Sequence, residues 1–151
     1  MYDTIRLLFQ DLTYKVHPFR GNTAESLLCV FDGHGGKSTA LAARDTMEGA
    51  VTAGFRRFES THLRPPTTLE EYTGLFTEVF AGIQEAILAT HTVNPEQPHV
   101  ATPDDDGCAA LVVYRTGNTL VTVSAGDCGA VLFTHTPSEA KLISATHSMT
   151  E

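Results

Sequence analysis

The residues with the clearest chemical potential are Asp32, Gly33 and His34, which follow an apolar stretch and precede two further glycines. A carboxylate such as that of Asp32 can bind a hard divalent cation, and a backbone carbonyl can approach the same ion where Gly33 has no side chain. Histidine commonly transfers protons near neutral pH, so His34 is a candidate proton donor. The alternative is a glycine-rich turn in which Asp32 caps the next helix. These residues alone leave both interpretations open.

An expected strand and an expected helix flank this segment. Residues 26–31 form a continuous apolar run, which is typical of a buried strand. Residues 37–58 carry apolar side chains at every third or fourth position, which predicts an amphipathic helix. A second helix is expected from about residue 67 to residue 90, since Thr67 and Thr68 each precede a glutamate by three residues, as in a capping box. The side chains expected to face the core are Ala40, Leu41, Ala43, Met47, Val51, Phe55, Leu69, Tyr72, Leu75, Phe76, Val79, Phe80, Ile83 and Ile87.

Strand-like sequence lies on both sides of the two helices. Residues 6–16 are rich in β-favouring side chains and are followed by a turn at 17–22. Residues 92–106 are expected to form an exposed loop, and its three aspartates at 104–106 are more often solvated than cation-binding. The later strands are expected at 109–114, 119–125, 130–134 and 140–144. This order predicts a largely antiparallel sheet with both helices on its outer face.

The composition is that of an acidic globular protein. The 151 residues include 10 Lys and Arg against 18 Asp and Glu, a net charge of −8, which disfavours binding to a nucleic-acid backbone. No apolar run approaches the ~20 residues of a membrane-spanning helix, and the first residues lack the features of a secretory signal. We therefore expect an intracellular, cytoplasmic protein with neither nucleic acid nor membrane as partner. Cys29, Cys108 and Cys128 are widely spaced among apolar or small residues, which indicates free packing thiols.

Four short segments, in order, resemble motifs of the metal-dependent protein phosphatase 2C family. Residues 30–36 resemble its strand that ends in Tyr/Phe-Asp-Gly-His-(Gly/Ala)-Gly, and residues 107–110 resemble its Gly-Ser-Thr-Ala segment. Residues 125–132 resemble its Gly-Asp-Ser-Arg turn, and residues 142–147 resemble its Leu-(Ser/Thr)-x-Asp-His element. Within the third motif, Asp127 is expected to fix the turn through hydrogen bonds to backbone N–H groups.

The resemblance implies a fold and a reaction. The implied fold class is α+β, an antiparallel β-sandwich flanked by two long antiparallel helices, of which residues 1–151 would form a single domain or the N-terminal portion of one. The implied reaction is the hydrolysis of phosphoserine and phosphothreonine by water that bridges two Mn²⁺ or Mg²⁺ ions.

The family's site residues carry over to five positions. Asp32 corresponds to a carboxylate that bridges the two metal ions, Gly33 to a carbonyl ligand, and His34 to the general acid. Arg6 matches the arginine that clamps phosphate, because a guanidinium suits a bidentate grip on an oxyanion. An arginine at the start of a strand is usually only a surface charge, so the assignment of Arg6 as the phosphate-binding arginine rests on its spacing to Gln10. Gln10 itself stands in the place of a metal-binding glutamate.

Several departures from the family pattern affect the expected metal site. The amide of Gln10 brings no charge to offset divalent cations, which predicts weak or absent binding of Mn²⁺ or Mg²⁺. Thr146 stands where the family has an aspartate, and Cys128 and Gly129 replace a Ser-Arg pair. The chain stops at Glu151, before the family's C-terminal half with its remaining carboxylates.

We therefore expect a catalytically impaired pseudophosphatase that acts as a binding or regulatory module, with a phosphoprotein or another protein as partner. The alternative is an active Mn²⁺- or Mg²⁺-dependent protein serine/threonine phosphatase whose C-terminal half is missing from this chain or is supplied by a partner. A sandwich that lacks half of its strands exposes an apolar sheet edge or face, which predicts a homo-oligomer or association with another chain.

Overall fold

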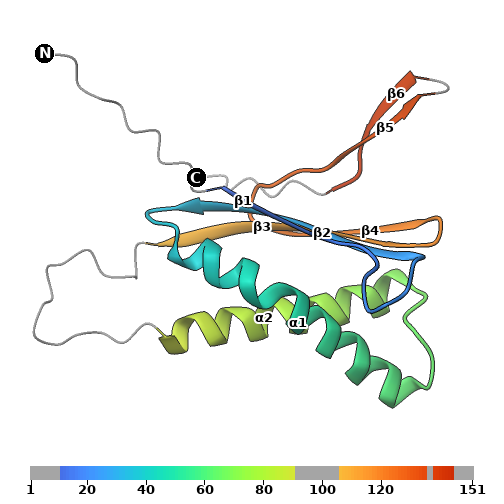
Figure 1. Ribbon diagram of the computed structural model, residues 1–151, viewed down its shortest axis with the longest axis horizontal. Coiled ribbons are helices and arrows are strands. Elements are labelled where there is room, and N and C mark those ends of the chain that lie inside the picture. The colour runs from blue at the N-terminus through green and yellow to red at the C-terminus, as the bar shows by residue number, and fades with distance from the viewer. Residues whose placement is uncertain (1–10, 91–105, 136–137, 145–151) are drawn as a thin grey trace, which may run out of the picture.

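The computed structural model describes residues 11–90, 106–135 and 138–144 (Figure 1). They form a four-stranded sheet, two helices that cover one face of it, and a separate two-stranded hairpin. The elements in chain order are β1 (Leu12–Val16), β2 (Glu25–His34), α1 (Ser38–His62), α2 (Leu69–Thr90), β3 (Gly107–Thr116), β4 (Thr119–Ala125), β5 (Val131–His135) and β6 (Ser138–Leu142). Within these ranges, no helix combines the length and apolarity needed to cross a membrane.

The sheet has the order β1-β2-β3-β4, and every pair of neighbours is antiparallel. Strands β2 and β3 are adjacent although both helices separate them in sequence. The helices form a hairpin on one face of this sheet (Figure 1). The predicted α+β class, with an antiparallel sheet and two long helices on its outer face, is therefore confirmed.

Alternating burial along β2 distinguishes the two faces of the sheet. Leu27, Cys29 and Phe31 are at most 2% exposed and belong to the core shared with the helices. Leu28 and Val30 point to the opposite face and are 40% and 39% exposed. We call this second face the open face; the β2 residues on it are Leu28, Val30, Asp32 and His34. Part of it is apolar and accessible, and the association with another chain expected there stays a prediction.

The core lies between the helix pair and the sheet. The periodicity of the sequence located it well, with Leu41 and Phe80 only partly buried. The prediction is wrong for Leu69, which is 80% exposed because it is the first residue of α2 and precedes the turn that reaches the core. The helix residues buried in the core are Ala40, Ala43, Met47, Val51, Phe55, Tyr72, Leu75, Phe76, Val79, Ile83 and Ile87.

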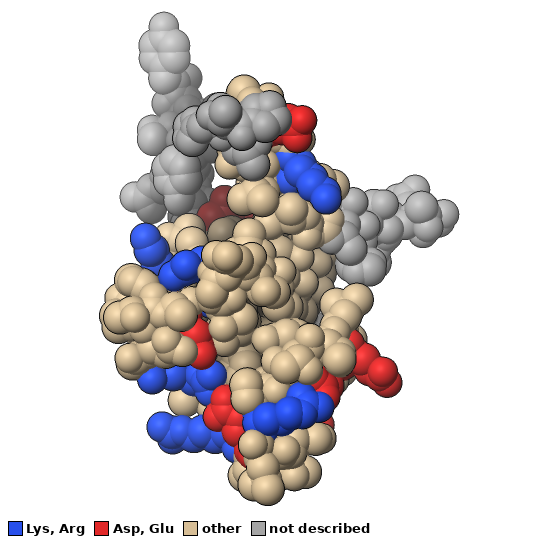
Figure 2. All heavy atoms as spheres, turned by 90° about the vertical axis from the view of Figure 1, so that its right-hand side faces the viewer, with Lys and Arg blue, Asp and Glu red and all other residues tan. Residues whose placement is uncertain are grey.

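The start of α2 has the predicted capping box, formed by Thr68 and Glu71. The backbone N–H of Glu71 donates to the Thr68 hydroxyl oxygen at 3.3 Å, and the Glu71 carboxylate accepts from the Thr68 N–H at 3.2 Å. Arg64 also pairs with Glu71, and its hydrogen bond holds the pKa of that carboxyl far below the usual range. On the side of the molecule seen in Figure 2, basic and acidic side chains lie side by side rather than in a patch of one sign.

Strand β2 extends three residues beyond the strand expected at 26–31 and includes Asp32, Gly33 and His34. The extension has a partner because β3 begins at Gly107, directly opposite His34. The register continues with Gly33 opposite Cys108 and Asp32 opposite Ala109. The strand alternation therefore sends the Asp32 and His34 side chains to the open face and leaves Gly33 buried between them.

Candidate functional site

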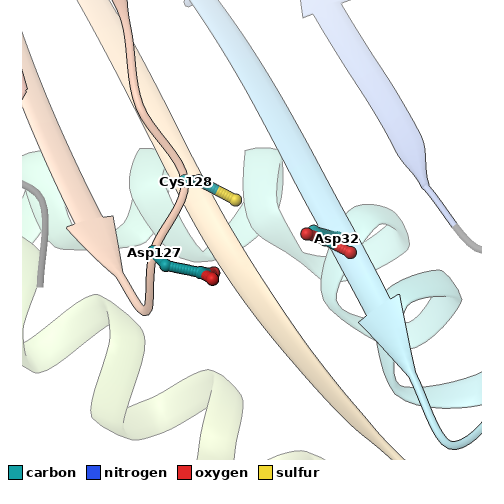
Figure 3. A group of neighbouring side chains, drawn as sticks. All are labelled: Asp32, Asp127 and Cys128. Atoms are coloured by element: carbon teal, nitrogen blue, oxygen red, sulfur yellow. The ribbon is translucent and has the colours of Figure 1, made fainter. Parts of the chain in front are cut away.

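Two side chains from a turn distant in sequence approach Asp32 on the open face (Figure 3). Asp127 and Cys128 lie in the turn between β4 and β5, and both point across β3 toward Asp32. The carboxylate oxygens of the two aspartates and the sulfur of Cys128 all lie within 4.8 Å of one another. Both aspartates are exposed and Cys128 is half-buried, so solvent reaches this group of three donors.

A glycine brings this turn onto the sheet. Gly126 has a φ of +95°, a conformation that residues with side chains rarely adopt. A Cβ atom placed on Gly126 would lie 2.7 Å from the Cβ atom of Ala109, the residue opposite Asp32 in the register. Only a residue without a side chain lets the turn lie this close to β3, and this contact sets Asp127 and Cys128 beside Asp32.

The carboxyl group of Asp32 is crowded by negative charge. The largest cause of its raised pKa is partial burial. The neighbouring carboxyl of Asp11 raises this pKa further, through its charge and a hydrogen bond, and the charge of Asp127 adds a smaller effect. His34 opposes these effects weakly. Carboxylates that raise one another's pKa are stabilised as anions when a cation binds among them.

The thiol of Cys128 responds to the same surroundings. Burial is the largest cause of the raised pKa of this thiol, and the negative charges of Asp32 and Asp127 raise the pKa further. A hydrogen bond between the backbone of Asp32 and the sulfur works in the opposite direction. The free thiol therefore keeps its proton at neutral pH, and a bound cation would have to displace it.

His34 lies two residues beyond Asp32 on the same face of β2. Its imidazole covers the backbone of Gly107, and a Cβ atom placed at residue 107 would overlap the ring. The structure thus brings Asp32 and His34 to one surface, because both lie on the open face of the extended strand β2. The roles of the Gly33 carbonyl as ligand and of His34 as proton donor stay predictions.

The other sequence-based site assignments have different outcomes. Arg6 and Gln10 lie outside the described residues, so their roles also stay predictions.

The interpretation of the cysteines as packing residues is confirmed for Cys29 and Cys108, which lie in or against the core. Cys128 is also a free thiol, but it is only half-buried, lies outside the core and belongs to the donor group. The sequence held one sign of this donor group, because two side chains of metal-ligand type, Asp127 and Cys128, lie between two glycines. Their distance to Asp32 could not be predicted, since it depends on the contact of the turn with β3.

The family model described as Protein phosphatase 2C matches residues 5–151. The chain belongs to the protein phosphatase 2C family. No curated protein matches it. Among solved structures, it is similar to the crystal structure of serine-threonine phosphatase 2C from Toxoplasma gondii, with a TM-score of 0.63 and 12% sequence identity.

That match covers 94% of this chain and 46% of the Toxoplasma gondii chain, so this chain spans less than half of the solved protein. At 12% identity the similarity supports the fold. The family is metal-dependent, and the donors around Asp32 suit one divalent cation. Carboxylate oxygens from Asp32 and Asp127 are hard ligands, whereas the sulfur of Cys128 is a soft one.

Asp106 ties the segment that follows His34 to the start of β3. Its Oδ2 atom accepts hydrogen bonds from the backbone N–H of Ser38 at 2.8 Å, from the Ser38 hydroxyl, and from the N–H of Thr39 at 3.4 Å. Its backbone carbonyl accepts from the Thr39 hydroxyl at 3.0 Å. A Cβ atom on Gly36 would lie 2.7 Å from the same Oδ2. The last aspartate of the acidic run therefore caps the N-terminus of α1 from outside the helix, where the N-cap residue Lys37 makes no side-chain cap of its own, and the prediction of a solvated side chain is wrong for Asp106.

We expect the Asp106→Ala substitution to destabilise the protein by about 1–2 kcal/mol, because α1 loses its cap. Burial alone would raise the pKa of Asp106, but the hydrogen bonds from Ser38 and Thr39 together hold it below the usual value. A carboxyl with a lowered folded-state pKa stabilises above its unfolded pKa of about 3.9 and loses that effect as pH falls. Urea unfolding should show a gap between wild type and variant that narrows below about pH 4.

Asp45→Asn is the matched control, since Asp45 lies on α1 with its side chain 62% exposed. Its effect should stay within about 0.5 kcal/mol. An equal loss in both variants would contradict the assignment of Asp106 as the cap.

Proposed function

We propose that this chain is a protein phosphatase 2C-type domain that binds one divalent cation at Asp32 and acts as a binding or regulatory module with impaired hydrolysis. The observation that carries the proposal is the donor group of two carboxylates and one thiol within 4.8 Å. Hydrolysis through a pair of cations depends on enough negative charge to hold both ions close together. Among the described residues, the group at Asp32 offers donors for one.

The sequence supports the same conclusion. Gln10 stands where the family has a metal-binding glutamate, and an amide oxygen ligates a cation without neutralising its charge. Weak binding of Mn²⁺ or Mg²⁺ follows from this substitution. Asp32 and His34 would then form a surface that receives a phosphorylated segment of a protein partner, held by the cation and by Arg6.

An active Ser/Thr phosphatase is the second candidate. It is favoured by the position of His34 beside Asp32, which leaves a proton donor next to the cation site. In that case further carboxylates would come from sequence outside this chain or from a partner. Turnover separates this candidate from the first, because both predict binding of a cation.

Calorimetric titration with Mn²⁺, together with turnover of a phosphoserine peptide, tests the proposal. We expect wild type to bind Mn²⁺ weakly at one site and to release no phosphate above the metal-free rate. The Gln10→Glu substitution adds a carboxylate and should tighten Mn²⁺ binding by about tenfold, or ~1.4 kcal/mol.

Gln84→Glu is the control, because it adds the same charge at an exposed position of α2. It should leave Mn²⁺ affinity unchanged. Metal-dependent phosphate release by wild type would overturn the assignment of impaired hydrolysis, and a wild-type chain that binds no cation at all would overturn the cation site.

A further inference from the structure

Cys128 is the one member of the donor group whose chemistry departs from that of a Mn²⁺ or Mg²⁺ site. Mg²⁺ and Mn²⁺ prefer oxygen ligands, whereas thiolate sulfur selects Zn²⁺ and related thiophilic cations. The sulfur lies within 4.8 Å of the carboxylate oxygens of both Asp32 and Asp127. Donors in a tetrahedral zinc site, about 2.0–2.3 Å from the ion, lie ~3.3–3.8 Å apart, so side chains spaced within 4.8 Å reach ligating positions with small movements.

The fold holds this sulfur in place from two directions. The contact of Gly126 with Ala109 brings the turn onto β3. The backbone of Asp32 lies close enough to the sulfur to lower the pKa of the thiol, against the larger effect of burial. The sulfur is therefore beside both the backbone and the carboxylate of Asp32. Cys128 and Asp32 are far apart in sequence, so this arrangement is a property of the tertiary structure.

The other two cysteines do not share this position. Cys29 is 2% exposed on the core face of β2, and Cys108 packs against the core from β3. Among the three thiols, only that of Cys128 belongs to a group of ligand atoms with the spacing of a metal site in the described part of the chain. A sulfur–metal signal therefore has a single expected source.

We propose that Cys128 ligates the cation at Asp32 and Asp127 and makes this site selective for a thiophilic divalent ion of the Zn²⁺ class over Mn²⁺ and Mg²⁺. This inference rests on the proposed cation site and specifies which ion it takes. On binding, a bond forms between the sulfur and the metal, and the thiol proton passes to solvent. Three protein donors with one position open to solvent is a ligand count found in zinc sites that bind a further molecule.

Titration with Co²⁺ tests the inference, because Co²⁺ substitutes for Zn²⁺ and a cobalt–thiolate bond gives a charge-transfer band in the near ultraviolet. Wild type should develop this band with one equivalent of Co²⁺, and Zn²⁺ should abolish it by competition. Cys128→Ser should lack the band and lose at least about tenfold in Zn²⁺ affinity by calorimetry. Its Mn²⁺ affinity should not fall, since a hydroxyl oxygen is an acceptable ligand for a hard ion.

Cys108→Ala is the matched control and should retain the band, while circular dichroism establishes that all variants keep the fold. Co²⁺ binding to wild type without the band would overturn the role of Cys128 and leave a cation site of oxygen ligands. A band that persists in Cys128→Ser would overturn it as well. Failure of wild type to bind Co²⁺, Zn²⁺ or Mn²⁺ would overturn both this inference and the cation site on which it rests.

Discussion

Replacement of Phe55 by alanine is expected to destabilise the protein by about 3–5 kcal/mol, the cost of removing a fully buried aromatic side chain. Phe55 is 0% exposed and lies where the helix pair meets the sheet. Four aromatic rings surround it, with centroid distances of 4.9 Å to Tyr114, 6.3 Å to Phe19, 6.3 Å to Phe76 and 6.5 Å to Tyr72. The cavity would therefore open between the helix pair and the sheet, among side chains from several elements.

Rigid neighbours make this cavity costly. The surrounding rings come from β3, α2 and the turn before β2, so no single side chain can move in to fill the space. The substitution also removes the ring over which the Arg20 guanidinium lies, 4.3 Å from the centroid. A cation near an aromatic face contributes about 0.5–2 kcal/mol.

Urea unfolding followed by circular dichroism measures this effect, with Phe58→Ala as the control. Phe58 lies on the same helix but is only partly buried and stacks on His62, so its truncation should cost much less. Phe55→Leu keeps most of the apolar volume and provides a folded comparison if the alanine variant does not fold. Equal losses for Phe55→Ala and Phe58→Ala would contradict the central position of Phe55.

The helices were largely predictable because their signals are local. Apolar spacing identified the buried face of α1, and Thr68 with Glu71 marked the start of α2. The end of β2 was not predictable in this way. A run of Asp, Gly and His resembles a loop, and it becomes a strand because β3 supplies partners from Gly107 onward. Likewise, β6 lies two residues earlier than the predicted strand at 140–144.

The candidate site was likewise predictable only where its features are local in sequence. Asp32 and His34 are close in sequence, so the local pattern marked both as candidates, but their common face depends on the extension of β2 against β3. Asp127 and Cys128 reach Asp32 through the positive φ of Gly126 and its contact with Ala109, which are tertiary features. The sequence indicated a turn there but not where the turn lies. The family motif supplied the fold, whereas the departure at Cys128 became informative only when its sulfur was located.

The Glu25→Ala substitution is expected to destabilise the protein by about 3 kcal/mol, the lower end of the range for breaking a buried ion pair. Glu25 is 6% exposed, and its carboxylate accepts hydrogen bonds from Nε of Arg20 at 3.1 Å and from Nδ2 of Asn22 at 3.0 Å. A second Arg20 nitrogen donates at 3.1 Å, which makes the pair bidentate. Without Glu25 the guanidinium keeps only Glu59, at 2.9 Å, and remains largely shielded from water.

Two further variants separate electrostatics from packing in the same urea experiment. Glu59→Ala removes a partner that is 34% exposed and should cost less than about 1 kcal/mol. Combining Arg20→Met with Glu25→Met removes both charges and keeps apolar volume, so the double variant should be more stable than Glu25→Ala. The reason is that an unpaired buried charge costs more than the pair contributes. If the double variant is instead the least stable of the three, the pair stabilises the turn by its own hydrogen bonds and this electrostatic account is wrong.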